Sequence, residues 1–208
     1  MGSALSRVVL GALLLVLGGG RGGCAEPPLL LRQPAVNDST IVFCYAGDLW
    51  KVDRAGGDAV RLTSGAGTES GPCFSPDGRT VAFTGEYDGN VDAFTVPVEG
   101  GTPRRLTYHP SDDTVVGWNP NGKSVLVQSS RSSYAGFARL YSVPIEGGFA
   151  TELPLPTARE GCYSPDGTHL VYVPNLKWQQ AWKRYRGGQT SALWIADLSD
   201  SSVERIPR

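Results

Sequence analysis

The chain has 208 residues, with 19 Lys and Arg against 20 Asp and Glu, so its formal net charge is −1. That balance, without any long run of like charge, argues against a nucleic-acid binder and against an acidic or basic tail. The length is enough to bury a sizeable core, and 27 Gly, 15 Pro and a single Met among many short Val-, Leu- and Tyr-rich runs favour an all-β chain over a helical one.

Residues 1–25 are predicted to be a signal peptide. Their apolar segment, 8–17, is too short to span a bilayer and is followed by a glycine-rich stretch. Gly23 and Ala25 provide the small residues for cleavage before residue 26, which predicts soluble export to the periplasm or the exterior. The alternative is a lipoprotein attached at Cys24, although an Arg stands where lipid attachment favours an apolar residue. We expect no membrane span in the mature chain.

The mature chain begins with a unit at residues 31–70. A turn at 33–39 opens it, and apolar runs that predict short strands follow at 41–43, 48–52 and 60–63. The sequence Asn37-Asp-Ser39 is a formal glycosylation sequon, which we interpret only as the mark of a surface turn.

A second unit, residues 71–112, shows the pattern most clearly. Its Ser75-Pro-Asp-Gly78 sequence predicts a tight turn, because Pro presets φ, Asp can bond its own backbone and Gly accepts positive φ. Four strands are predicted, at 72–74, 80–84, 92–97 and 103–107. The other two turns, 86–90 and 99–101, also carry residues that tolerate positive φ.

Two further units, 113–157 and 158–208, repeat this arrangement. The turn residues Ser75, Asn119 and Ser164 follow one another at steps of 44 and 45 positions. Strands are predicted at 125–127 and 139–143 in the third unit, and at 170–173, 192–196 and 203–206 in the fourth. Both units carry inserted residues between their second and third strands, at 129–136 and 175–188.

Four antiparallel strands in a repeat of about 44 residues are typical of a β-propeller blade. The predicted fold is therefore an all-β propeller with about four blades. Propeller rings hold about four to eight blades, so four could close on themselves. The resemblance described next favours a larger ring, of which this chain would be the front part.

The repeated unit resembles the WD40-like repeat of TolB and of several peptidase propellers. Its elements are Ser-Pro-Asp-Gly, a strand, Asp88-Gly-Asn90, a strand ending in Val-Pro-x-Glu-Gly-Gly, and Pro103-Arg-Arg-Leu-Thr107. Stretches at 45–50, 83–90 with 106–110, and 182–188 are more specific. From about Leu31 to its last residue, the chain resembles the N-terminal six-bladed propeller of the tricorn protease family.

This resemblance implies a large oligomeric serine peptidase that degrades peptides or proteins, in which propellers gate a path to a later catalytic region. The catalytic residues of the family lie beyond this sequence, so none is carried over, and no cofactor is implied. The alternative function is a TolB-like periplasmic propeller that binds an envelope protein partner. A hydrolase formed by this chain alone has little support, because no Gly-x-Ser-x-Gly sequence is present.

The aromatic and basic stretch within 177–186 is the best candidate for a contact with a peptide or a partner. Its alternative is a hairpin that packs its tryptophans on a neighbouring blade or domain while its charges face water, and this is the arrangement we expect. The residues concerned are Trp178, Trp182, Lys183, Arg184 and Arg186.

Other polar residues are expected to be structural. Ser75 and Ser164 recur in equivalent turns, whereas a catalytic serine is needed once. His109 and His169 lack an evident nucleophile partner, so we expect them to be structural or exposed. The acidic residues around 88–92 fit a hairpin turn better than a calcium loop, and no metal site is predicted.

Cysteines are predicted to be free. Cys73 and Cys162 occupy equivalent places two repeats apart, too distant for a disulfide, whose Cα atoms must approach to about 7 Å. Together with Cys44, which lies on a predicted strand, they are expected to be buried thiols.

Overall fold

The computed structural model describes residues 30–174 and 192–207, which form sixteen β-strands and contain no helix. The strands make four separate sheets of four consecutive strands each, with every neighbouring pair antiparallel. The all-β prediction of repeated four-stranded antiparallel units is therefore confirmed. We call the sheets blades 1 to 4 in chain order.

Each blade is a simple meander. Blade 1 contains β1 (Arg32–Val36), β2 (Thr40–Tyr45), β3 (Asp48–Asp53) and β4 (Val60–Arg61). Blade 2 contains β5 (Thr68–Phe74), β6 (Thr80–Tyr87), β7 (Asn90–Pro97) and β8 (Arg104–Arg105). Blade 3 contains β9 (Asp113–Trp118), β10 (Ser124–Ser129), β11 (Arg139–Pro144) and β12 (Thr151–Glu152). Blade 4 contains β13 (Glu160–Tyr163), β14 (His169–Val173), β15 (Trp194–Asp197) and β16 (Val203–Arg205).

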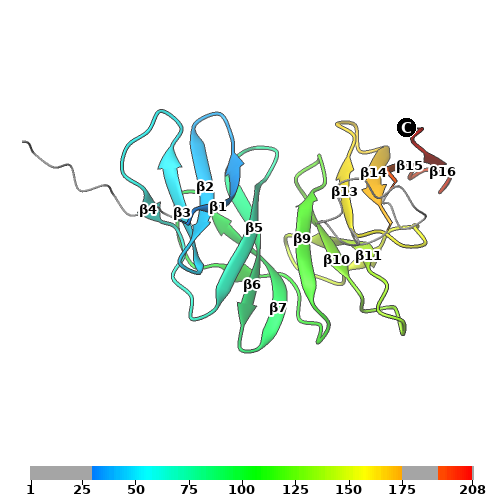
Figure 1. Cartoon of the computed structure of the whole chain (residues 1–208), viewed down its shortest axis with the longest axis horizontal. Coiled ribbons are helices and arrows are strands. Elements are labelled where there is room, and N and C mark those ends of the chain that lie inside the picture. Colours follow the sequence, from blue (N-terminus) through cyan, green and yellow to red (C-terminus); the bar gives the residue numbers. More distant parts are fainter. Residues whose placement is uncertain (1–29, 175–191, 208) are drawn as a thin grey trace, which may run out of the picture.

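The blades follow one another along the long axis of the molecule. Blade 1 lies at one end of the view in Figure 1, in blue and cyan, and blade 4 lies at the other, in orange and red. The first strands of successive blades contact one another, β1 with β5, β5 with β9 and β9 with β13. The described residues thus form a row of blades whose first and last members stay apart, rather than a closed ring.

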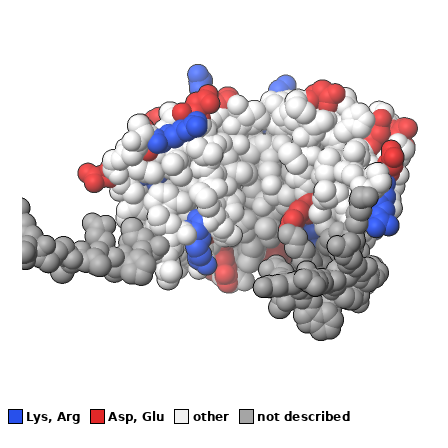
Figure 2. Space-filling view, turned by 45° about the horizontal axis from the view of Figure 1, so that its top comes forward, with Lys and Arg blue, Asp and Glu red and all other residues white. Residues whose placement is uncertain are grey.

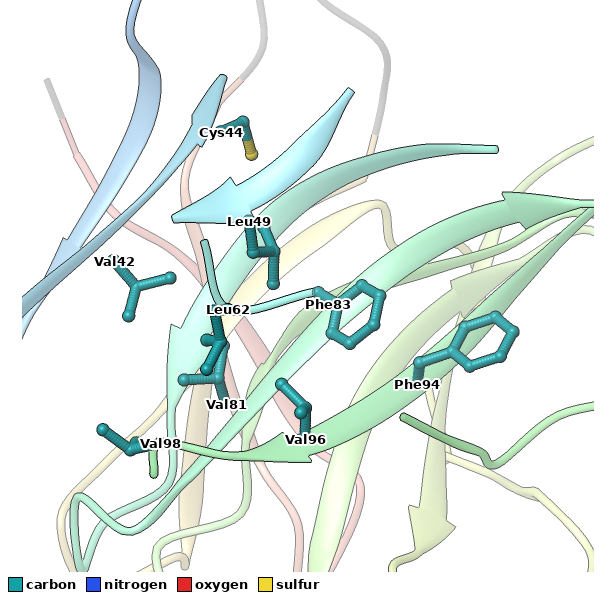
Figure 3. Packing of buried hydrophobic residues seen from close by; sticks show 9 residues of the cluster. All are labelled: Val42, Cys44, Leu49, Leu62, Val81, Phe83, Phe94, Val96 and Val98. Carbon is teal, nitrogen blue, oxygen red and sulfur yellow. The ribbon is translucent and has the colours of Figure 1, made fainter. Parts of the chain in front are cut away.

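The hydrophobic core lies between the blades. Figure 3 shows the junction of blades 1 and 2, where Val42 and Leu49 meet Val81, Phe83 and Val96. Side chains alternate along a strand, so neighbours on the middle strands serve opposite junctions. On β6, Phe83 faces blade 1, whereas the adjacent Ala82 belongs to the cluster shared with blade 3. Interior blades are therefore buried on both faces, which explains their continuous apolar runs.

The end blade has one covered face and one open face. On β14, Leu170 and Tyr172 are buried against blade 3, while Val171 between them is 37% exposed. In the described part of the chain no further blade packs on the Val171 side. The alternating exposure of β14 follows directly from its position at the end of the row.

This position also corrects one prediction. The described cysteines are free, and Cys44 is buried as expected, but Cys73 is only partly buried and Cys162 is exposed. Cys73 is covered by blade 3, whose Trp118 donates its Nε1–H to the Cys73 carbonyl at 3.1 Å. Cys162 holds the equivalent place in blade 4, where the covering blade is missing from the described residues.

The turns between the first and second strands of neighbouring blades lie against each other. Gly122 has a φ of +70°, and a Cβ at this position would lie 3.8 Å from Cδ of Pro76 in the preceding turn. The corresponding turns of blades 1 and 2 are joined by a hydrogen bond, in which Asn37 Nδ2 donates to the Gly78 carbonyl at 3.2 Å. The Asn37 amide is therefore a bridge between blades as well as part of a turn.

Candidate functional site

The binding residues predicted from sequence lie outside the described residues. Trp178, Trp182, Lys183, Arg184 and Arg186 all fall within 175–191, the segment that connects β14 to β15. Their contact with a peptide or partner stays a prediction. The site must be sought among the polar groups and hollows of the remaining residues.

A fully buried carboxylate, Glu69 on β5, joins blades 1 and 2. Its exposed fraction is 0%. From blade 1, the Leu49 amide donates to Oε2 at 3.0 Å and the Thr63 hydroxyl donates to the same oxygen. From blade 2, the Tyr87 hydroxyl donates to Oε1. A buried carboxylate with donors on both oxygens is satisfied, so Glu69 acts as a latch between the two blades.

Tyr87 links this latch to the surface. Burial, followed by the hydrogen bond to Glu69, raises the pKa of the Tyr87 phenol well above its usual value near 10. The group therefore keeps its proton and acts as a donor. Tyr87 also lines an open hollow of about 660 Å³ formed by residues 66–68 and 86–89, whose charged side chains are Glu86 and Asp88.

The junction of blades 2 and 3 also contains a buried carboxylate, but only one of its oxygens has a hydrogen-bond donor among the described residues. Asp113, 44 residues after Glu69, is equally buried, and Arg131, 44 residues after Tyr87, donates to its Oδ2. Its Oδ1 has no hydrogen-bond partner among the described residues. Asp is one methylene shorter than Glu, and Thr107, the counterpart of Thr63, instead donates to Asp92 at 3.1 Å.

Ion pairs hold the third strand of a blade to its fourth. Arg105 Nη2 lies 2.5 Å from Asp92 Oδ2, and Arg61 Nη2 lies 2.6 Å from Asp48 Oδ2, at the equivalent place in blade 1. In blade 2 the Ala93 amide also donates to the Thr107 hydroxyl at 3.0 Å. The backbone bonding beyond Arg105 ends with the Leu106 amide, which donates to the Ala93 carbonyl at 2.8 Å, and the Ala93 amide is then bound by the Thr107 side chain instead of the backbone.

A second hollow, of about 270 Å³, lies between the outer parts of blades 2 and 3. Buried Leu106 and Val143 form its apolar wall, and Tyr108 and Phe149 are its exposed aromatic residues. The complete lining is Leu106, Thr107, Tyr108, His109, Arg131, Val143, Gly148, Phe149 and Ala150.

The repeated serines serve their turns, as predicted. Ser75 Oγ donates to Asp77 Oδ1 at 2.6 Å and accepts from the Thr80 amide at 3.0 Å. In blade 4, the Ser164 hydroxyl donates to Asp166 Oδ1 at 2.5 Å, which is the main reason that the pKa of Asp166 falls to about 2. Both hydroxyls are thus used in backbone geometry.

The histidines have local partners. His109 Nδ1 accepts a hydrogen bond from the Ser111 amide at 3.0 Å, so this ring shapes the turn after β8. His169 is exposed at the start of β14, with its Nδ1 2.7 Å from the Thr168 hydroxyl and its Nε2 3.7 Å from Asp197 Oδ2. Neither contact forms a nucleophile and base pair with Ser75 or Ser164.

The acidic stretch at 88–92 forms the predicted hairpin. Asp88 and Gly89 have φ values of 54° and 77°, as a two-residue primed turn requires, and Tyr87 pairs with Asn90 across it. Within residues 30–174 and 192–207, no three His, Cys, Asp or Glu residues gather as metal ligands would. The same residues contain no helix that could cross a membrane.

A model of one protein family matches most of the sequence. It is described as the tricorn protease N-terminal beta propeller domain and matches residues 28–208. The chain belongs to this family. This tricorn-type propeller is also 32% identical over 187 residues to tricorn protease homolog 1 of Streptomyces coelicolor, an alignment that covers 88% of this chain and 17% of that protein.

Solved structures agree with the family. The crystal structure of the tricorn protease matches with a TM-score of 0.74 and 26% identity, covering 88% of this chain and 18% of that one. The structure of a putative TolB from Agrobacterium tumefaciens matches with a TM-score of 0.70 and 27% identity, covering 88% of this chain and 63% of that one. The chain thus spans less than a fifth of the length of the Streptomyces homolog and of the crystallised tricorn protease.

The sequence patterns did not predict the buried carboxylates at the two blade junctions. Glu69 and Asp113 stand in polar stretches that look like loops, yet their separation of 44 residues equals the repeat. Aligning the units from a few residues earlier would have found them. Phe149 was missed as well, because a single aromatic residue after Gly147-Gly148 carries no periodic signal.

Proposed function

We propose that this chain is the N-terminal propeller portion of an exported tricorn-like serine peptidase that degrades peptides or proteins. In this proposal the propeller serves substrate access, gating or assembly, and the catalytic groups lie elsewhere in the enzyme. The family match over residues 28–208 is the observation that carries the proposal.

The structural roles of the polar residues support a propeller whose catalytic groups lie elsewhere in the enzyme. Ser75 and Ser164 are committed to turns, and the buried carboxylates Glu69 and Asp113 hold blades together. On the face shown in Figure 2, basic and acidic side chains are interspersed without a basic patch, consistent with peptide or protein partners rather than nucleic acid.

The open face of blade 4 supports assembly into a larger ring. At the other junctions, the equivalents of Val171 and Cys162 are covered by the next blade, as Ala82 and Cys73 are by blade 3. We propose that further blades cover this face and complete a six-bladed ring, within a peptidase that forms homo-oligomers. Exposed apolar surface of this kind favours association.

Export is proposed from the sequence of residues 1–25. Cleavage after Ala25 would release a soluble protein into the periplasm or the exterior, and attachment at Cys24 would give a lipoprotein instead. Fractionation of source cells, with mass spectrometry of the mature N-terminus, separates these outcomes. Recovery of the protein in the cytosol with residues 1–25 intact would refute export.

Activity-based labelling tests the main proposal. The tagged propeller is purified from the cells that make it, and the eluate is treated with a fluorescent fluorophosphonate that labels active serine hydrolases. We expect one labelled serine peptidase to co-elute with the propeller on size exclusion, either on the same polypeptide or tightly bound. Elution without any labelled hydrolase would contradict the proposal.

The alternative is a TolB-like propeller that binds an envelope protein, and the match to the TolB structure favours it specifically. The same purification distinguishes the two functions. A stoichiometric envelope protein in an eluate that lacks a labelled hydrolase would support the TolB-like alternative.

A further inference from the structure

The hollow between blades 2 and 3 is bounded by two sheet edges. Its lining follows β8 directly at 106–109 and precedes β12 directly at 148–150. Both β8 and β12 are outermost strands, paired on one side only in their sheets. A sheet edge offers backbone N–H and C=O groups to an incoming extended chain.

The wall of the hollow is preformed. Leu106 is 5% exposed and Val143 is 1% exposed, and both belong to the hydrophobic cluster that joins blades 2 and 3. Close packing behind these side chains keeps the cavity from collapsing, so a ligand would not have to create it.

The aromatic rim is exposed yet partly held in place. Tyr108 is 73% exposed and Phe149 is 97% exposed, although both line the cavity. The Arg105 guanidinium lies 4.6 Å from the centre of the Tyr108 ring, and Arg105 is itself anchored by Asp92. The Tyr108 ring is therefore positioned on one side while most of its surface remains available.

The charges of the cavity select against a charged ligand. Among the described residues that line the cavity, Arg131 is the only Lys or Arg, and the Asp113 carboxylate already neutralises it. His109 uses its Nδ1 to accept from the Ser111 amide, and none of the described lining residues carries a carboxylate. An uncharged side chain meets no unpaired charge in this cavity, whereas a charged one would lose hydration without a free partner.

We propose that this cavity binds an uncharged, large apolar side chain presented by an extended peptide segment lying between the edges of β8 and β12. Leu106 and Val143 contact the inserted side chain, and Tyr108 and Phe149 flank it. The inference rests on the proposed function only in naming peptides as the ligand, and it adds a docking site on the outer side of the propeller for extended, apolar segments.

Peptide binding to the full chain tests the proposal. The probes are short, capped, fluorescently labelled peptides of Gly, Ser and Thr that carry Phe, Ala, Asp or Lys at one central position. We expect saturable binding by anisotropy, with the Phe peptide bound about tenfold more tightly than the Ala peptide and the charged peptides weakest.

Variants locate the binding. Tyr108→Ala and Phe149→Ala should each weaken Phe-peptide binding by about three- to tenfold, since each removes one flank of the cavity. The matched control is Tyr134→Ala, which removes a fully exposed aromatic residue outside the lining and should leave affinity unchanged. Ala150→Leu, which adds bulk inside the cavity, should weaken binding without removing an aromatic residue. Thermal unfolding verifies that each variant is folded.

Three outcomes would overturn the proposal: equal affinity for the Phe and Ala peptides, no saturable binding, or the same loss in Tyr134→Ala as in Tyr108→Ala. These outcomes leave the labelling experiment of the proposed function untouched. Conversely, absence of a co-eluting hydrolase would refute the peptidase role even if the cavity binds apolar peptides.

Discussion

Asp113 occupies in blade 3 the place that Glu69 occupies in blade 2, yet only Glu69 has donors on both carboxylate oxygens. Each residue sits on the first strand of its blade and is 0% exposed. The difference is one methylene group, which decides whether the carboxylate reaches the Thr hydroxyl of the preceding blade. The two junctions are therefore built on one plan and differ in how completely it is satisfied.

Asp113→Glu should stabilise the junction of blades 2 and 3. The longer side chain brings its second oxygen toward Thr107, as Glu69 does toward Thr63, and relieves a buried acceptor that has no partner among the described residues. We expect the free energy of unfolding in urea to rise by about 1 kcal/mol. Asp112→Glu, at the exposed neighbouring position, is the control and should have no effect. A destabilised Asp113→Glu protein would show that the two junctions are not equivalent.

Tyr87 should make the stability of the chain sensitive to alkaline pH. Its folded pKa is raised by burial and by Glu69, whereas a free phenol titrates near 10. Below about pH 10 both states keep the proton; above it only the unfolded chain loses the proton, so stability falls as pH rises toward the folded pKa. Urea unfolding from about pH 8 to about pH 11 measures this.

Tyr87→Phe is the matched variant. It removes the titrating group and one donor to Glu69, so it should be less stable than the parent at neutral pH by about 1 kcal/mol and lose part of the alkaline decline. An identical alkaline decline in both proteins would show that Tyr87 does not cause it.

Repeat spacing predicted the four sheets because every turn contains residues with a specific backbone role. Gly78 and Gly122 both have a φ of +70°, and their turns fall where the sequence placed them. Strand lengths were less predictable. In blades 1 and 2 the fourth strand ends where the hydroxyl of Thr63 or Thr107 accepts from a backbone amide of the third strand, and a pattern of apolar residues cannot show that exchange.

From the repeat pattern, residues at corresponding positions of different blades are expected to be equally buried. That holds only inside the row of blades, where each face is covered by a neighbour. Cys162 and Val171 have the residue types of a covered face but lie on an open one. Burial at the end of a repeat array depends on what packs there, which the repeat itself does not encode.

The cysteines should differ in reactivity. Burial raises the pKa of Cys44, and burial raises that of Cys73 to about 12, so both are protected from alkylation near neutral pH. Of the three described cysteines, Cys162 is the exposed one and should react first with iodoacetamide, as peptide mapping by mass spectrometry would show. Cys162→Ser is the control and should remove the fast phase. Equal labelling of Cys73 and Cys162 in the native chain would mean that blade 3 does not cover blade 2.

The 208-residue chain, studied by itself, should self-associate through its end blades. The open face of blade 4 presents Val171, and on the outward side of blade 1 Val36, which pairs with Ile41, is 60% exposed. Because every junction in the row joins one face of a blade to the opposite face of the next, two or more chains can associate head to tail. Sedimentation velocity should show species larger than a monomer, in a proportion that increases with protein concentration.

Val171→Lys places a charge on the open face and should shift the distribution toward monomer. Tyr134→Lys introduces the same charge away from that face and should not. If the parent chain is a monomer at every concentration, its exposed blade faces do not associate. If the two substitutions have equal effects, net charge and not the open face of blade 4 controls the association.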